Sequence, residues 1–170
     1  MERLTTSDTR SYIPALNQIA LTEYRAYEFY LAWAQATRDK DVERVMRIVA
    51  IRELEHAAAF QQRIFELGDL PLDGPHDFGP QCDEWLHLFK SDASDLEKFR
   101  GFGFKDPHRL PQDNFHDLFL DCTLDSETGA LLGRYIAEER ESANMFLEVY
   151  ARLLEREQED EHDTQSATAL

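Results

Sequence analysis

Residues 42–67 read VERVMRIVAIRELEHAAAFQQRIFEL and carry a stripe of apolar side chains at steps of three and four. Such steps place side chains on one face of an α-helix, so the segment predicts an amphipathic helix that buries this face. Two residues in the middle of the face, Glu53 and His56, are polar. The complete stripe is Val42, Val45, Val49, Glu53, His56, Phe60, Ile64 and Leu67.

A second helix is predicted upstream, from about residue 14 to residue 37. Its first turn contains a proline, whose missing N–H group needs no partner there. Residues 38–41 form a short turn with Asp41 as the expected N-cap, and Gly68 is expected to end the following helix. So short a turn predicts an antiparallel hairpin over 13–68. The buried face of the upstream helix holds one carboxylate: Leu16, Ala20, Glu23, Tyr27, Tyr30 and Ala34.

The first hairpin has a partial repeat later in the chain. A shift of 86 positions overlays residues 37–68 on 123–154 with seven identities in 32 positions, and the turn and the apolar stripe coincide. A helix is therefore predicted over 126–157, and the clear part of the helix before it is 112–123. The stripe of the later helix again holds one carboxylate: Leu131, Tyr135, Glu139, Ser142, Phe146, Val149 and Leu153.

The insert between the hairpins, residues 69–111, contains five of the six prolines. Irregular structure is therefore expected there, apart from a short helix within 81–100. Because a connection of this length usually has a function, we expect it to cover one end of the helices or to contact a second copy. Residues 158–170 are polar and are expected to form a disordered acidic tail.

The predicted fold is all-α, with one domain over residues 1–157 that consists of the hairpins 13–68 and 112–157 and the insert. A buried carboxylate is costly unless it is paired, protonated or bound to a cation. A divalent metal ion is one solution, because iron, manganese and zinc bind carboxylate oxygen and imidazole nitrogen. If no metal binds, Glu23 is instead expected to pair with Arg25 or Arg52. Glu53 and His56 would then form a structural core pair.

The helical faces resemble the ferritin-like superfamily, and within it the rubrerythrin-type proteins. Residues 23–30, Glu-Tyr-Arg-Ala-Tyr-Glu-Phe-Tyr, are similar to the pattern E-x-x-A-x-x-x-Y of that family. Residues 53–57, Glu-Leu-Glu-His-Ala, are similar to its E-x-x-H-A. The resemblance implies a four-helix bundle that holds a pair of metal ions reactive toward oxygen or peroxide. It also implies a homodimer.

The second hairpin departs from the metal-binding pattern of this family. Ser142 stands at the repeat of His56, and Arg109 stands at the repeat of Glu23. Other side chains that could serve in the second half are Asp106, Asp113, His116, Glu138 and Glu141. The expected ligands of iron or manganese, bound as a single ion or as a pair, are Glu23, Glu53, His56 and Glu139.

Two functions fit these residues. The first is an oxidoreductase of the oxidase, peroxidase or oxygenase type, which acts on a small-molecule substrate. The second is a ferritin-like scaffold that has lost part or all of its metal site and binds a partner protein. Iron storage fits less well, because the long insert and the incomplete second half do not resemble a cage-forming subunit.

The overall charge narrows the classes of partner. The chain has 170 residues, with 18 basic and 34 acidic side chains and a net charge of −16. Nucleic-acid binding and docking to anionic membranes are not expected, because both require positive potential. No apolar run reaches the length of about 18–20 residues that a membrane helix needs, so we expect a cytoplasmic protein. Cys82 and Cys122 are expected to be free thiols.

Overall fold

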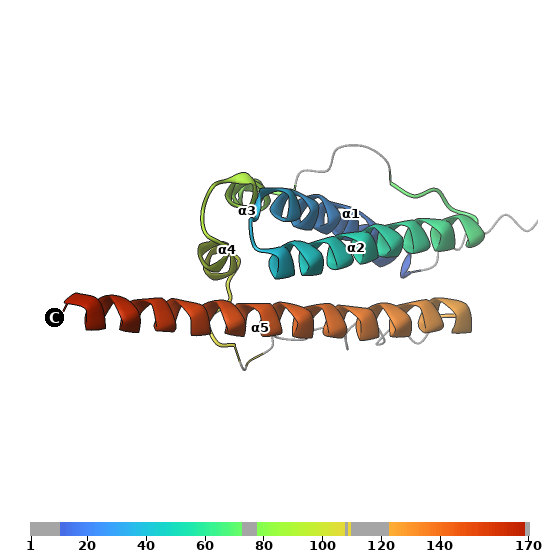
Figure 1. The fold of residues 1–170 in the computed structure, drawn as a ribbon. Coiled ribbons are helices and arrows are strands. Elements are labelled where there is room, and N and C mark those ends of the chain that lie inside the picture. The colour runs from blue at the N-terminus through green and yellow to red at the C-terminus, as the bar shows by residue number, and fades with distance from the viewer. Residues whose placement is uncertain (1–10, 73–77, 108, 110–122, 169–170) are drawn as a thin grey trace, which may run out of the picture.

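The computed structural model describes residues 11–72, 78–107, 109 and 123–168 (Figure 1). All regular structure in this part of the chain is helical, as the sequence predicts. No helix among these residues has the length and hydropathy that a membrane crossing would require. The helices are α1 (Ile13–Ala36), α2 (Lys40–Glu66), α3 (Pro80–Lys90), α4 (Asp95–Gly101) and α5 (Ser126–Thr168).

The predicted hairpin of α1 and α2 is confirmed, with helix ends within two residues of those expected. Gly68 follows the end of α2 with a φ of +85°, which glycine adopts at little cost. The predicted N-cap, Asp41, is wrong. The cap is Asp39, whose side chain accepts hydrogen bonds from the backbone N–H groups of Asp41 and Val42, so the helix begins two residues earlier.

Helix α5 runs antiparallel to α2 (Figure 1). Ion pairs join the end of α2 to the start of α5, through Arg63 and Asp125, and the start of α2 to the distal part of α5, through Asp39 and Arg156. The prediction that the helix ends near Glu157 is wrong, because α5 continues to Thr168. The segment expected to be a disordered tail begins with good helix formers, and these extend the helix.

The insert contains two helices, α3 and α4, where the sequence predicts one. Ser94 begins α4 with a capping box, in which its side chain and that of Glu97 bond to each other's backbone N–H groups. The insert packs on the first hairpin: Trp33 stacks on Phe89 at 4.8 Å between ring centroids and donates a hydrogen bond from Nε1 to Asp95. Trp33 is fully buried.

Two apolar clusters lie along the helices, one at each side of the middle of the hairpin. One contains Tyr30, Trp33 and Phe146 together with the aromatic residues of the insert. The other contains Leu16, Phe60 and Tyr135. The expected metal ligands come from positions between the two clusters, so apolar packing lies on both sides of them.

Some expectations fall outside the described residues. These include the helix predicted at 112–123 and its possible ligands, Asp113 and His116. Cys122 also falls outside the described residues, whereas Cys82 is a free thiol as expected.

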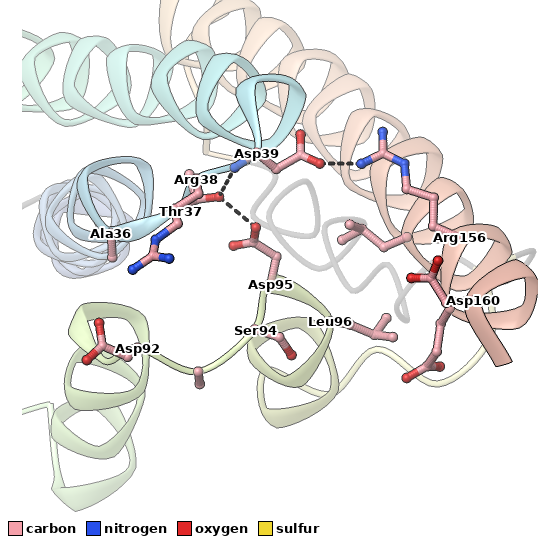
Figure 2. A pocket seen from close by; sticks show the side chains of 13 residues that line it. Ala36, Thr37, Arg38, Asp39, Asp92, Ser94, Asp95, Leu96, Arg156 and Asp160 are labelled. Atoms are coloured by element: carbon pink, nitrogen blue, oxygen red, sulfur yellow. Dashed lines mark hydrogen bonds and ion pairs between the residues drawn. The ribbon is translucent and has the colours of Figure 1, made fainter. Parts of the chain in front are cut away.

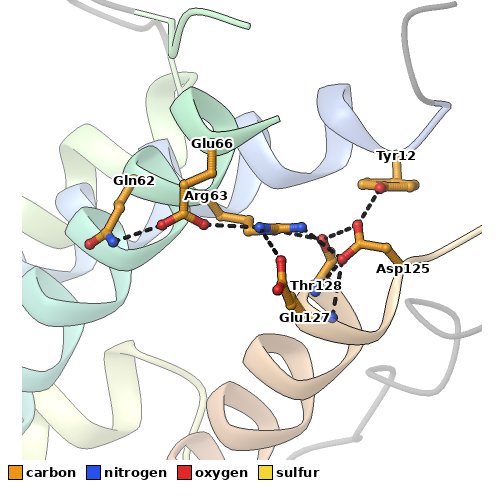
Figure 3. Close-up of polar contacts among 7 residues, drawn as sticks. All are labelled: Tyr12, Gln62, Arg63, Glu66, Asp125, Glu127 and Thr128. Atoms are coloured by element: carbon orange, nitrogen blue, oxygen red, sulfur yellow. Dashed lines mark hydrogen bonds and ion pairs between the residues drawn. The ribbon is translucent and has the colours of Figure 1, made fainter. Parts of the chain in front are cut away.

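A polar network fastens the start of α5 to the hairpin (Figure 3). Asp125 caps α5 by accepting from the backbone N–H groups of Glu127 and Thr128. The same carboxylate accepts from Arg63 Nη2 at 2.7 Å and from the Tyr12 hydroxyl at 2.6 Å. Burial acts to raise the pKa of Asp125, but hydrogen bonds from Tyr12 and Thr128 and the charge of Arg63 outweigh it and hold the pKa well below its usual value.

Replacing Asp125 with alanine is expected to lower the free energy of unfolding by about 2 kcal/mol, because the helix loses its cap and Arg63 loses an ion pair. Asp125→Asn should cost about half as much, since its amide oxygen still caps the helix. Urea unfolding followed by circular dichroism measures both values. An alanine variant as stable as the wild type would show that the network does not hold α5 in place.

Candidate metal centre

The structure brings together all four residues that the sequence predicts as ligands. Helix α1 supplies Glu23, α2 supplies Glu53 and His56, and α5 supplies Glu139. One potential ligand atom from each residue lies within 4.8 Å of the corresponding atom of every other residue. Glu23, Glu53 and His56 are each at most 5% exposed, and the side chain of Glu139 is 21% exposed. The group is therefore buried, with one carboxylate nearest the solvent.

Three atoms of this group are buried without a hydrogen-bond partner: Glu53 Oε2, His56 Nδ1 and Glu139 Oε1. His56 Nδ1 lies 3.4 Å from Glu53 Oε2 and 3.3 Å from Glu139 Oε1, so the three atoms converge. Glu23 Oε2 lies 4.0 Å from the same nitrogen. Because buried polar atoms nearly always have partners, this convergence fits a bound cation.

Neighbouring side chains hold the candidate ligands in place. His56 Nε2 lies 2.7 Å from Glu138 Oε2, a contact that turns the opposite ring nitrogen toward the carboxylates. Tyr135 donates a hydrogen bond from its hydroxyl to Glu23 Oε1 at 2.8 Å. Partners of this kind orient metal ligands in proteins generally.

The electrostatics of the metal-free group favour bound protons. Burial, together with hydrogen bonding and repulsion from Glu53, raises the pKa of Glu23 to about 10. Burial, together with the charge of Glu139, raises the pKa of Glu53 to about 8. Burial acts to lower the pKa of His56, but the carboxylates of Glu139 and Glu138 outweigh it and raise that pKa. Protons thus partly compensate this cluster when no metal is bound.

The pairing of Glu23 with an arginine, considered above, is wrong. Arg25 pairs with Glu28 at 2.8 Å and with Asp83 at 3.0 Å. Arg52 reaches across to α5, where Nη2 pairs with Glu141 at 2.7 Å and Nη1 donates to Ser142 Oγ at 3.2 Å. The buried carboxylate of Glu23 therefore faces the other candidate ligands instead of a guanidinium.

The other described candidates of the second half do not join the group of potential ligands. Asp106 and Arg109 are exposed in the segment after α4. Glu141 is 62% exposed and pairs with Arg52. Glu138 contacts Nε2 of His56 instead. The sequence does not reveal this role, because Glu138 lies beside the apolar stripe. Tyr135 gave a clearer signal, because it lies one helical turn from Glu139 on the same stripe.

An open cleft of about 930 Å³ lies elsewhere, at the end of the hairpin where α1 joins α2 (Figure 2). Several of its polar groups bond to one another: Thr37 donates to Asp95 at 2.6 Å, and Arg156 pairs with Asp39. None of the four candidate ligands lines this cleft. The cleft is therefore separate from the candidate metal centre.

The structure thus shows an all-α protein with a buried group of three glutamates and one histidine that could hold a metal ion. Among the residues that the structure describes, these four make up the group of acidic and histidine side chains close enough to share an ion. No family model, curated protein or solved structure matches the chain. Its function must therefore be inferred from the chemistry of this group.

Proposed function

We propose that this protein is a ferritin-like metalloprotein that binds iron or manganese through Glu23, Glu53, His56 and Glu139. One observation carries the proposal: three buried atoms of these side chains have no hydrogen-bond partner, and they converge. A purely structural cluster would join such atoms by hydrogen bonds, whereas these atoms approach to 3.3–3.4 Å without one. The resemblance of residues 23–30 and 53–57 to rubrerythrin-type proteins supports the same assignment.

The donor set narrows the choice of metal. Three carboxylates and one imidazole suit iron or manganese, and no thiolate that would favour a softer metal belongs to the group. A bound iron or manganese ion would supply redox chemistry with oxygen or peroxide, so we assign the protein to the oxidoreductases of the oxidase, peroxidase or oxygenase type.

The residues around the centre have separable tasks in this proposal. Tyr135 orients Glu23 through its hydroxyl, and Glu138 orients the His56 ring. The flanking apolar clusters limit the access of water. Glu139 is the most exposed ligand, so a small molecule would approach from its side.

A second candidate function is a scaffold whose metal site is incomplete and which acts by binding a partner. Ser142 and Arg52 favour it, because they place a hydroxyl and a guanidinium in the second half of the centre.

We also propose that the protein forms a homodimer. The exposed apolar residues Ile51, Leu54 and Phe65 on the outward face of α2 support a protein contact of this kind.

Elemental analysis of the purified chain, after loading with Fe²⁺ or Mn²⁺ and removal of excess metal, tests the proposal. We expect at least one ion per wild-type chain and almost none in the Glu53→Ala/His56→Ala variant. The matched control is Glu55→Ala, which removes an exposed glutamate of the same helix. A wild-type chain that retains no metal under these conditions would overturn the proposal of a metalloprotein and favour the scaffold function.

A further inference from the structure

Two contacts between α2 and α5 correspond to each other under the sequence repeat. Under the shift of 86 positions that relates the two hairpins, Ser142 corresponds to His56 and Glu138 corresponds to Arg52. The structure shows both of the corresponding contacts: His56 Nε2 lies 2.7 Å from Glu138 Oε2, and Arg52 Nη1 donates to Ser142 Oγ at 3.2 Å. The partial sequence repeat is therefore also a repeat of packing.

The two halves of this arrangement have opposite chemistry. In one half, a carboxylate holds an imidazole whose other nitrogen is buried without a partner. In the other half, a guanidinium holds the hydroxyl of Ser142, which is 2% exposed. The guanidinium also donates to the backbone carbonyl oxygen of Glu138 at 3.4 Å and pairs with Glu141. A hydroxyl therefore stands where a symmetric centre would place its second histidine, and a positive charge stands where it would place the carboxylate that holds this histidine.

We infer that the centre holds a single metal ion, and that Arg52 together with Ser142 excludes a second ion. This inference rests on the proposed function, because it concerns the same centre. Within the centre, the buried atoms without a hydrogen-bond partner belong to Glu53, His56 and Glu139, and none of them belongs to the buried Ser142. The hydroxyl of Ser142 already accepts a hydrogen bond, and a hydroxyl is a weaker ligand than imidazole.

The charge of Arg52 also disfavours a second ion. The guanidinium lies against Ser142, where its ion pair with Glu141 and its hydrogen bond to the Glu138 carbonyl oxygen hold it. A divalent ion bound beside Ser142 would stand next to this positive charge. Repulsion between like charges is stronger in a partly buried site, such as that of Arg52, than in water.

Titration of the full chain with Mn²⁺ tests the inference in two ways. Elemental analysis should reach one ion per chain, and the electron paramagnetic resonance spectrum of the loaded protein should show isolated Mn²⁺. Two ions per chain, with the spin-coupled spectrum expected for ions about 3.5–4 Å apart, would overturn the inference and leave the proposed function intact. A chain that binds no Mn²⁺ and no Fe²⁺ would overturn the proposed function and the inference with it.

The variant Arg52→Glu/Ser142→His tests the cause, because it installs in the second half the pair of residue types found in the first. We expect binding to rise from one to about two Mn²⁺ per chain and the coupled spectrum to appear. Arg47→Glu makes the same charge change on α2 at a residue that pairs with Glu43, and it should stay at one. If circular dichroism shows that the double variant does not fold, Arg52→Gln/Ser142→His replaces it. A folded variant that still binds one ion would exclude Arg52 and Ser142 as the cause.

Discussion

Replacing Glu53 with glutamine is expected to stabilise the metal-free protein by about 3 kcal/mol at pH 7 while it removes metal binding. The carboxyl of Glu53 is 3% exposed, and its pKa rises from 4.5 to about 8 on folding. At pH 7 the folded protein must therefore keep a proton that the unfolded chain releases, at a cost of about 1.4 kcal/mol for each pH unit above 4.5. Glutamine is neutral in both states, so this cost disappears.

The opposite signs of the two effects separate a metal ligand from a structural partner. Urea unfolding in the presence of a chelator gives the stability of the metal-free protein, and equilibrium dialysis gives the metal affinity. Glu55→Gln is the control, because this residue lies on the exposed face of the same helix, and both quantities should stay close to wild type. A Glu53→Gln variant that is clearly less stable than the metal-free wild type would identify Glu53 as a structural partner.

The helical faces could be predicted from the sequence because burial imposes a period of three to four residues. Polar residues on such a face stand out, and this is how Glu23, Glu53, His56 and Glu139 were identified as a group. Glu138 did not stand out, because it lies beside the stripe, and its contact with His56 depends on how α5 is rotated against α2. A rotation of this kind follows from packing between helices, which the pattern of one helix does not contain.

Arg52 illustrates the same limit. The sequence places it next to Glu53, where it could pair with a carboxylate of α1 or reach toward α5. The replacement of the expected histidine by Ser142 could be recognised from the repeat alone. The effect of this replacement on the metal centre could not be predicted, because it depends on Arg52 crossing to α5 and donating a hydrogen bond to the Ser142 hydroxyl. The N-cap was misplaced for a simpler reason: two aspartates lie two residues apart, and either could begin α2.

The metal-free protein is also expected to lose about 4–8 kcal/mol of stability between pH 5 and pH 8. The pKa values of Glu23 and Glu53 in the folded state, about 10 and about 8, lie above the unfolded value of 4.5. The folded state therefore binds more protons than the unfolded state throughout this interval, and stability falls as pH rises. The raised pKa of His56 acts in the same direction above its unfolded value of 6.5. One proton retained by the group across three pH units corresponds to about 4 kcal/mol, and two protons, one on each glutamate, correspond to about 8 kcal/mol.

Saturation with metal should remove most of this pH dependence, because the ion takes the place of the retained protons. Metal affinity should then increase with pH over the same interval, since binding must displace those protons. Thermal and urea unfolding at pH 5, 6, 7 and 8, with chelator or with excess Mn²⁺, measures both trends. The Glu23→Gln/Glu53→Gln variant is the control, and its metal-free stability should vary much less. A metal-free wild type that became more stable from pH 5 to pH 8 would contradict this prediction. Its buried carboxylates would then be ionised and paired in the folded state, and no cation would be required to explain their convergence.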